Sequence, residues 1–158
     1  MRIYKTKNGI NGFTLLEVMV ASAVFAVGML GVFKMMAVGI VANRYAKDLT
    51  TANLLLQKQI EMVSREAFNN VVNGTAGGSV AFFDNGTNGD VTSGDGIFTR
   101  QFTQNGKVYT LTLRSQQNTP RANLETITGT ASWTDMGSAA INTVQKTRRL
   151  TFTTYKSS

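Results

Sequence analysis

Gly12-Phe13-Thr14-Leu15-Leu16-Glu17-Val18 opens an apolar stretch that decides the fold of this chain and continues to residue 42, with Lys34 between its two runs. Residues 18–33 carry no charge, and Glu17 is the only ionisable side chain in residues 13–33. A helix rises about 1.5 Å per residue, so about 20 apolar residues cross a hydrocarbon core of about 30 Å. The stretch therefore predicts a membrane-spanning helix.

The composition limits the chemistry that this chain can perform. Its 158 residues include no cysteine and no histidine, which excludes disulfides, thiol nucleophiles and the commonest general base. The formal net charge is +7, and without residues 1–12 the 13 Lys and Arg against 9 Asp and Glu leave +4. The isolated carboxylates show no pairing at helical spacing, and we predict no enzyme, no catalytic residue, no resident metal and no cofactor.

Residues 1–12 are short, polar and basic, and they directly precede the apolar stretch. By the positive-inside rule we expect this end in the cytoplasm and the C-terminal part exported. One alternative is a secretory signal cleaved at Ala21-Ser22-Ala23. It is disfavoured because Glu17 interrupts its apolar core and residues 24–33 would become a strongly apolar new N-terminus. A plain signal anchor is the second alternative.

The helical pattern continues beyond the apolar stretch. Apolar residues recur at steps of three or four, as on one face of a helix, and no proline precedes Pro120. We predict one continuous helix over residues 13–68. The apolar face comprises Val38, Val41, Tyr45, Leu49, Ala52, Leu56, Ile60, Val63 and Ala67. The opposite, solvated face is predicted to carry the pairs Arg44–Asp48 and Glu61–Arg65, each spaced i,i+4.

Strand signals follow this helix. Residues 69–96 are rich in Asn, Gly, Thr, Ser and Asp and predict a long loop, with one short strand or turn at residues 80–83. Asn105-Gly106 favours a type I′ turn that joins two strands into a hairpin. Four strands are expected in total, at residues 97–103, 107–114, 124–134 and 144–155.

A sheet of about four antiparallel strands with one apolar face needs a cover, and the amphipathic half of the helix is the candidate. We therefore predict an α+β fold, with a long N-terminal helix packed on a small antiparallel meander. Trp133 is expected in that interface, because a large indole in a threonine-rich strand usually buries its rings. The alternative is a stacking platform for a sugar or a base.

Glu17 is the unusual residue of the apolar helix. A central carboxylate costs about 2.5–3.5 kcal/mol on insertion scales, and less near a helix end, so it calls for a partner. Alternatively, Glu17 reaches the membrane interface and is stabilised by the positive end of the helix dipole.

The basic leader followed by Gly-Phe-Thr-Leu-Leu-Glu-Val-Met-Val-Ala at residues 12–21 resembles the class III signal of type IV pilins and related pseudopilins. The α+β prediction then corresponds to the pilin fold. Within that group, the chain is similar to the PilV-type minor pilins, or type IV pilus modification proteins. That similarity rests on residues 79–86 and on Trp133-Thr134-Asp135 before a basic final strand.

The resemblance implies roles for three residues. Prepilin peptidase would cut between Gly12 and Phe13, and the new amine of Phe13 would be methylated. Glu17 would pair with the N-terminal amine of a neighbouring subunit, because a cationic amine in an apolar bundle needs a carboxylate nearby. The expected regions are a leader at 1–12, a transmembrane and assembly helix at 13–42, its amphipathic continuation at 43–68, and a globular part at 69–158.

The implied function is that of a minor pilin in a priming or tip complex that promotes pilus assembly. Its partners would be other minor pilins, the major pilin, prepilin peptidase and inner-membrane lipid. It would cross the bacterial inner membrane once, with its C-terminal domain in the periplasm, and reach the cell-surface pilus after assembly. The alternatives are a type II secretion pseudopilin and a membrane-anchored module that binds DNA or a surface ligand.

Two weaker patterns remain. Asp84, Asp90 and Asp95 offer hard oxygen ligands on a loop, as calcium requires, but without EF-hand spacing, and a solvated loop is the default interpretation. Lys146, Arg148 and Arg149 form a candidate contact for DNA or another anion, together with Arg114 and Lys156. Strand alternation puts Arg148 and Arg149 on opposite faces, which weakens the interpretation as a single patch.

Overall fold

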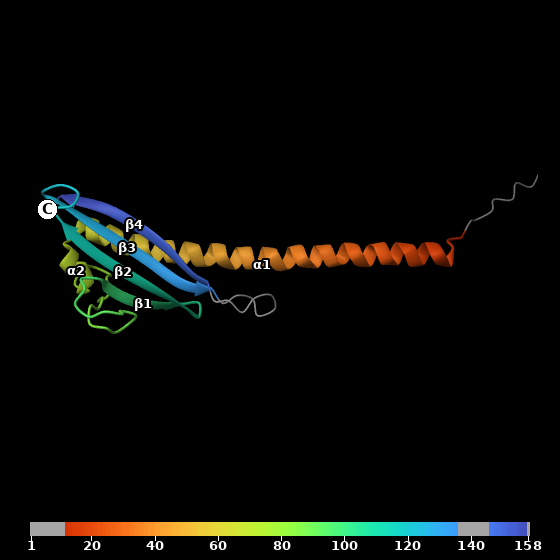
Figure 1. The fold of residues 1–158 in the computed structure, drawn as a ribbon, viewed down its shortest axis with the longest axis horizontal. Helices are drawn as coiled ribbons and strands as arrows, with labels where there is room; N and C mark the ends of the chain where they lie inside the picture. The colour runs from red at the N-terminus through yellow and green to blue at the C-terminus, as the bar shows by residue number, and fades with distance from the viewer. Residues whose placement is uncertain (1–11, 136–145, 158) are drawn as a thin grey trace, which may run out of the picture. The chain divides into compact units, whose positions relative to one another are not determined.

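A computed structural model describes residues 12–135 and 146–157 (Figure 1). The chain divides into two compact units, Met1–Asn43 and Arg44–Ser158. The helices are α1 at Leu15–Arg65 and α2 at Phe68–Val72. The strands are β1 at Phe98–Gln104, β2 at Lys107–Gln117, β3 at Leu124–Asp135 and β4 at Lys146–Ser157. A long N-terminal helix with a four-stranded antiparallel sheet confirms the predicted α+β class and matches the pilin fold.

The long helix ends three residues earlier than predicted. Ala67 adopts an extended conformation, with φ −66° and ψ 142°, and separates α1 from α2. The Lys156 ammonium donates hydrogen bonds to the carbonyl oxygens of Val63, at 3.1 Å, and Glu66, at 2.5 Å. These bonds satisfy carbonyl groups at the end of α1 that lack a partner within the helix. The predicted loop over residues 69–96 is correspondingly wrong at its start, because α2 extends to Val72.

The sheet is an uninterrupted antiparallel meander in the order β1-β2-β3-β4. Asn105 and Gly106 both have positive φ, 53° and 73°, which confirms the predicted type I′ turn between β1 and β2. The expected short strand is an isolated bridge from Phe83 to Thr99 of β1. Threonine-rich strands with alternating apolar residues thus form a sheet with one buried face.

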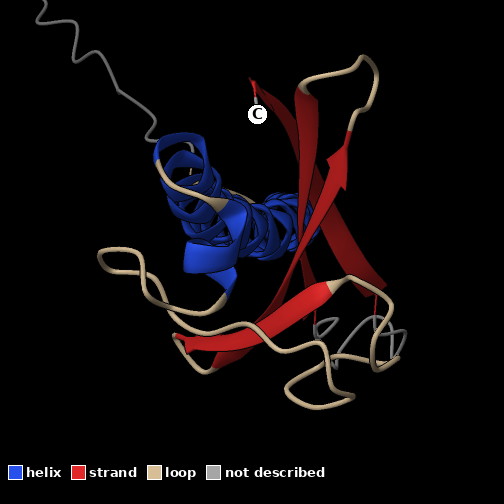
Figure 2. Ribbon diagram, turned by 90° about the vertical axis from the view of Figure 1, so that its left-hand side faces the viewer, coloured by secondary structure: helices blue, strands red, loops and turns tan. Residues whose placement is uncertain are grey.

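The core of the second unit lies between the sheet and the helices (Figure 2). Gly129 of β3 lets α1 approach closely, since a Cβ atom there would lie 2.7 Å from Leu56 Cδ1 and 2.9 Å from Ile60 Cδ1. Trp133 is 3% exposed, which confirms its predicted place in the interface and removes it as an exposed stacking platform. The fully buried apolar side chains are those of Ala52, Leu56, Val63, Val71, Leu111, Leu113, Ile127 and Ala131.

Asp48 was predicted on the solvated face of the helix, and that prediction is wrong. Its side chain is 16% exposed and forms an ion pair with Lys107 at the start of β2. The Tyr109 hydroxyl donates a hydrogen bond of 3.1 Å to the same carboxylate. Burial, followed by the charge of Asp48, raises the pKa of Tyr109 above its usual 10.0. The second predicted pair, Glu61–Arg65, is present at 2.5 Å and exposed.

Candidate functional site

The start of α1 is a local hydrogen-bonded unit. The Thr14 hydroxyl accepts a hydrogen bond from the backbone N–H of Glu17 at 3.2 Å, and the Thr14 carbonyl accepts one from Val18 at 3.2 Å. Thr14 is therefore the N-cap, and Glu17 is the third residue of the helix. Our sequence reasoning overlooked this role of Thr14, although the spacing Thr-x-x-Glu before an apolar run is a known start signal for helices.

The first unit leaves its apolar surface uncovered within the described chain. Phe13 is 83% exposed, and all described residues from 12 to 43 are exposed. By length and composition, α1 is able to cross a membrane, and it lies near the N-terminus. An apolar surface of this extent needs lipid or neighbouring apolar helices around it.

Glu17 is the only carboxylate on this apolar part of α1. Among the described residues, no hydrogen bond or ion pair reaches its side-chain oxygens. Its place in the first turn puts the negative charge at the positive end of the helix dipole. Within an apolar surrounding, a carboxylate there favours a nearby cation, and the described residues do not supply one.

Gly12 lies just before the helix and is not required by the fold. A Cβ atom added at this position would meet no other atom within 4 Å. Phe13, the next residue, is equally free of tertiary contacts in its own unit, as its exposure shows. A requirement for glycine at position 12 would therefore come from recognition of the chain by another molecule.

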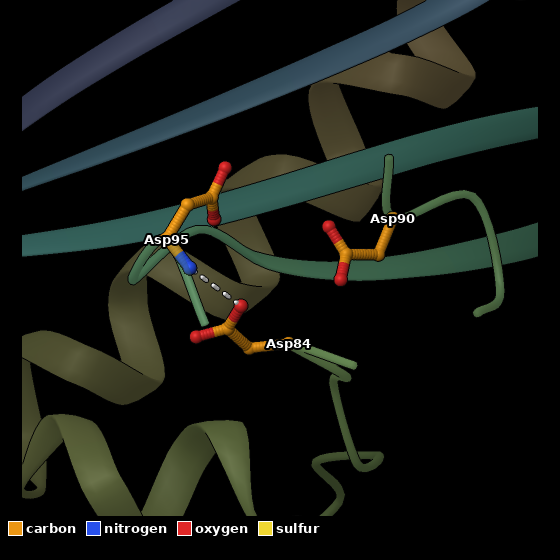
Figure 3. Close-up of side chains that lie close together, drawn as sticks. All are labelled: Asp84, Asp90 and Asp95. Atoms are coloured by element: carbon orange, nitrogen blue, oxygen red, sulfur yellow. Dashed lines mark hydrogen bonds between the residues drawn. The ribbon is translucent and has the colours of Figure 1, made fainter. Parts of the chain in front are cut away.

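The acidic loop brings three carboxylates together, as Figure 3 shows. Oxygen atoms of Asp84, Asp90 and Asp95 lie within 4.8 Å of one another. The Asp84 carboxylate also accepts backbone N–H groups from Gly94 at 2.7 Å, from Asp95 at 3.1 Å and from Gly96 at 3.1 Å. These hydrogen bonds hold residues 94–96 against Asp84, so the two ends of the loop lie together. Nothing besides the three carboxylates in the described residues points to a bound cation.

The candidate basic residues of β4 are divided between the two faces of the sheet. The Arg148 guanidinium lies 4.9 Å from the ring centre of Tyr45, on the face that α1 covers. Arg149 is exposed on the other face. The side chain of Lys146 lies outside the described residues. This division agrees with the alternation expected for a strand.

A comparison with protein families finds the prokaryotic N-terminal methylation motif at residues 7–33. The matched segment includes Gly12, Phe13, Thr14 and Glu17, the residues at the start of α1. Comparisons with curated proteins and with solved structures give no significant match. The methylation motif, the long apolar helix and the four-stranded antiparallel sheet together support a type IV pilin-like protein.

Proposed function

We propose that the protein is a minor pilin, stored in the inner membrane and incorporated in a priming or tip complex of a type IV pilus. The observation that carries the proposal is the Glu17 carboxylate, which has no partner among the described residues and lies on an exposed apolar helix inside a methylation motif. In a helix that only tethers a domain, the Glu17 charge would serve only to stabilise the start of the helix. In an assembling subunit, the carboxylate also neutralises a cation presented by a neighbour.

Processing supplies that cation. Prepilin peptidase removes residues 1–12, and the new amine of Phe13 is then methylated. The amine of one subunit pairs with Glu17 of the next within a bundle of apolar helices, which sets their axial register. Before assembly the same helix spans the membrane, with the basic residues 1–12 in the cytoplasm and the sheet in the periplasm.

The cleavage step is tested with Gly12→Leu in the native host. Since the surroundings of Gly12 leave room for a side chain, the variant should fold normally, keep residues 1–12 and fail to assemble. Intact mass and the content of sheared pili report these effects. Gly28→Ala is the control, because a Cβ at Gly28 also meets no atom within 4 Å. Normal processing and piliation of Gly12→Leu would refute the proposal.

The assembly step is tested with Glu17→Ala. The variant should be cleaved and retained in the membrane but absent from pili, whereas a simple tether would behave as the wild type. Glu61→Ala removes an exposed carboxylate of the second unit and should assemble normally. Equal assembly of both variants would contradict the role of Glu17.

The minor-pilin role and the resemblance to PilV are more specific than the type IV pilin-like family that the methylation motif supports. A type II secretion pseudopilin is the alternative, since the methylation motif suits both. Deleting the gene distinguishes them: loss of pili with intact protein secretion supports a pilin, and the reverse supports a pseudopilin.

A further inference from the structure

Strand β4 forms an open edge of the sheet among the described residues. It pairs with β3 from Leu124↔Ser157 to Asp135↔Lys146, without a break in register, and lies at the border of the sheet (Figure 1). The opposite edge, β1, is partly occupied by the bridge between Phe83 and Thr99. The outward N–H and C=O groups of β4 can therefore pair with a further strand.

β4 lacks the usual structural devices that protect an edge. It has twelve residues, contains no proline and shows no bulge in its pairing with β3. Its protection against unwanted pairing is its charge, because all of its charged residues are basic: Lys146, Arg148, Arg149 and Lys156. A second copy of β4 added to this edge would bring like charges together, which disfavours self-association.

Among the described side chains of β4, Arg149 is the basic residue that is exposed on the uncovered face of the sheet. Arg148 faces Tyr45, and Lys156 donates to carbonyl oxygens of α1. Arg149 is exposed on the uncovered face of the sheet and forms no hydrogen bond or ion pair with any described residue. Along the same strand, Phe152 and Tyr155 are 43% and 61% exposed and offer apolar surface on opposite faces of the strand.

We infer that the edge of β4 binds an extended, acidic segment of a partner protein, which adds a fifth strand and places an Asp or Glu beside Arg149. Backbone hydrogen bonds supply the affinity in this mode, and side chains supply the specificity. The surface belongs to the unit Arg44–Ser158 and uses neither Phe13 nor Glu17. Binding at β4 and assembly through Glu17 can therefore be tested independently of each other.

The test uses the full chain in detergent micelles and two synthetic peptides of about nine residues. One peptide alternates Thr and Glu, and the other alternates Thr and Lys. Fluorescence anisotropy of the labelled peptides should give at least about tenfold tighter binding of the Glu peptide, because opposite charges favour and like charges oppose pairing. Hydrogen exchange should slow at β4 amides when it binds. Absence of binding, or equal binding of both peptides, would overturn the inference.

A charge reversal identifies the contact. Arg149→Glu should lose the preference for the Glu peptide and bind the Lys peptide instead. Arg114→Glu is the matched control, because Arg114 is exposed on the interior strand β2, opposite Thr128 of β3. Equal weakening by both substitutions would indicate general attraction of anions, including nucleic acid, and would refute strand addition. A stable dimer of the free chain through β4 would also refute it.

A proline pair tests the backbone contact. Thr153 and Thr154 are neighbours in β4, and successive N–H groups of a strand point in opposite directions. One of Thr153→Pro and Thr154→Pro therefore blocks the open edge, while the other breaks the pairing with β3. The fluorescence of Trp133, the only tryptophan, identifies the variant that keeps its fold. If the proline variant that keeps its fold binds the Glu peptide as tightly as the wild type, strand addition at β4 is contradicted. If both proline variants unfold, peptide binding by Arg149→Glu and Arg114→Glu provides the test.

Discussion

The Thr14 hydroxyl accepts a hydrogen bond from the backbone N–H of Glu17 at 3.2 Å. The residue that starts α1 and the acidic residue proposed for assembly are thus parts of one turn. Thr14 holds this turn in helical form, so the position of the Glu17 carboxylate depends on a capping hydrogen bond.

Replacing Thr14 with Ala should fray the first turn of α1. Loss of an N-cap typically costs about 1 kcal/mol, which corresponds to about a fivefold increase in local opening. Hydrogen exchange of the Val18 amide, which donates to the Thr14 backbone carbonyl, measures this increase in micelles, and Thr14→Ser should restore protection. Thr50→Ala is the control, since its hydroxyl donates to the Ala46 carbonyl within the helix. Unchanged exchange in Thr14→Ala would show that the cap is dispensable.

Replacing Asp48 with Ala should destabilise the second unit by about 2 kcal/mol, because Lys107 and the Tyr109 hydroxyl lose a shared, part-buried partner. The urea midpoint of Trp133 fluorescence measures the loss. Glu61→Ala breaks an exposed pair and should change stability by less than about 1 kcal/mol. Equal effects would mean that the Asp48 contacts contribute no more than a surface ion pair.

Replacing Gly129 with Ala should cost about 1–3 kcal/mol through overpacking against Leu56 and Ile60. Ile60→Val removes one of the two clashing methyl groups, so the double variant should lose less than the sum of the single losses. Gly77→Ala is the control, because no atom lies within 4 Å of a Cβ there. Strict additivity would argue against a direct contact.

Tyr109 should make the second unit sensitive to alkaline pH. Its pKa is raised above 10.0 in the folded state, first by burial and then by Asp48. The neutral phenol therefore favours the folded state, and this contribution is complete below pH 10 and lost as pH rises through the folded pKa. Tyr109→Phe should flatten the decline of the urea midpoint above pH 10. Tyr155→Phe, at an exposed ring, should leave the decline unchanged.

Sequence patterns predicted much of the fold because they are local. The period of the apolar residues indicated the long helix, and Asn105-Gly106 indicated the hairpin turn that its positive φ values confirm. The ends of α1 depended on single hydrogen bonds. Thr14 had a readable spacing at the N-terminal end, but the contribution of Lys156 at the C-terminal end came from 90 residues away and had no local signal.

In the candidate site too, some features have a local sequence signal and others depend on residues far apart in the chain. Gly12, Phe13 and Glu17 were predicted from sequence because they lie within six residues of one another, inside the segment that the methylation motif matches, and their roles stay a prediction. Asp48 was misplaced because a charged residue on a helix usually faces solvent. Only the folded sheet brings Lys107 and Tyr109 to that carboxylate.

By itself, the sequence determined the apolar helix, its single acid, the hairpin turn and the alternation of the strands, since each follows from neighbouring residues and the period of the backbone. Only the tertiary structure decided which charges are paired, where the long helix ends and which strand edge stays open. Those features depend on contacts between residues far apart in the chain, and such contacts exist only once the sheet has packed on the helix.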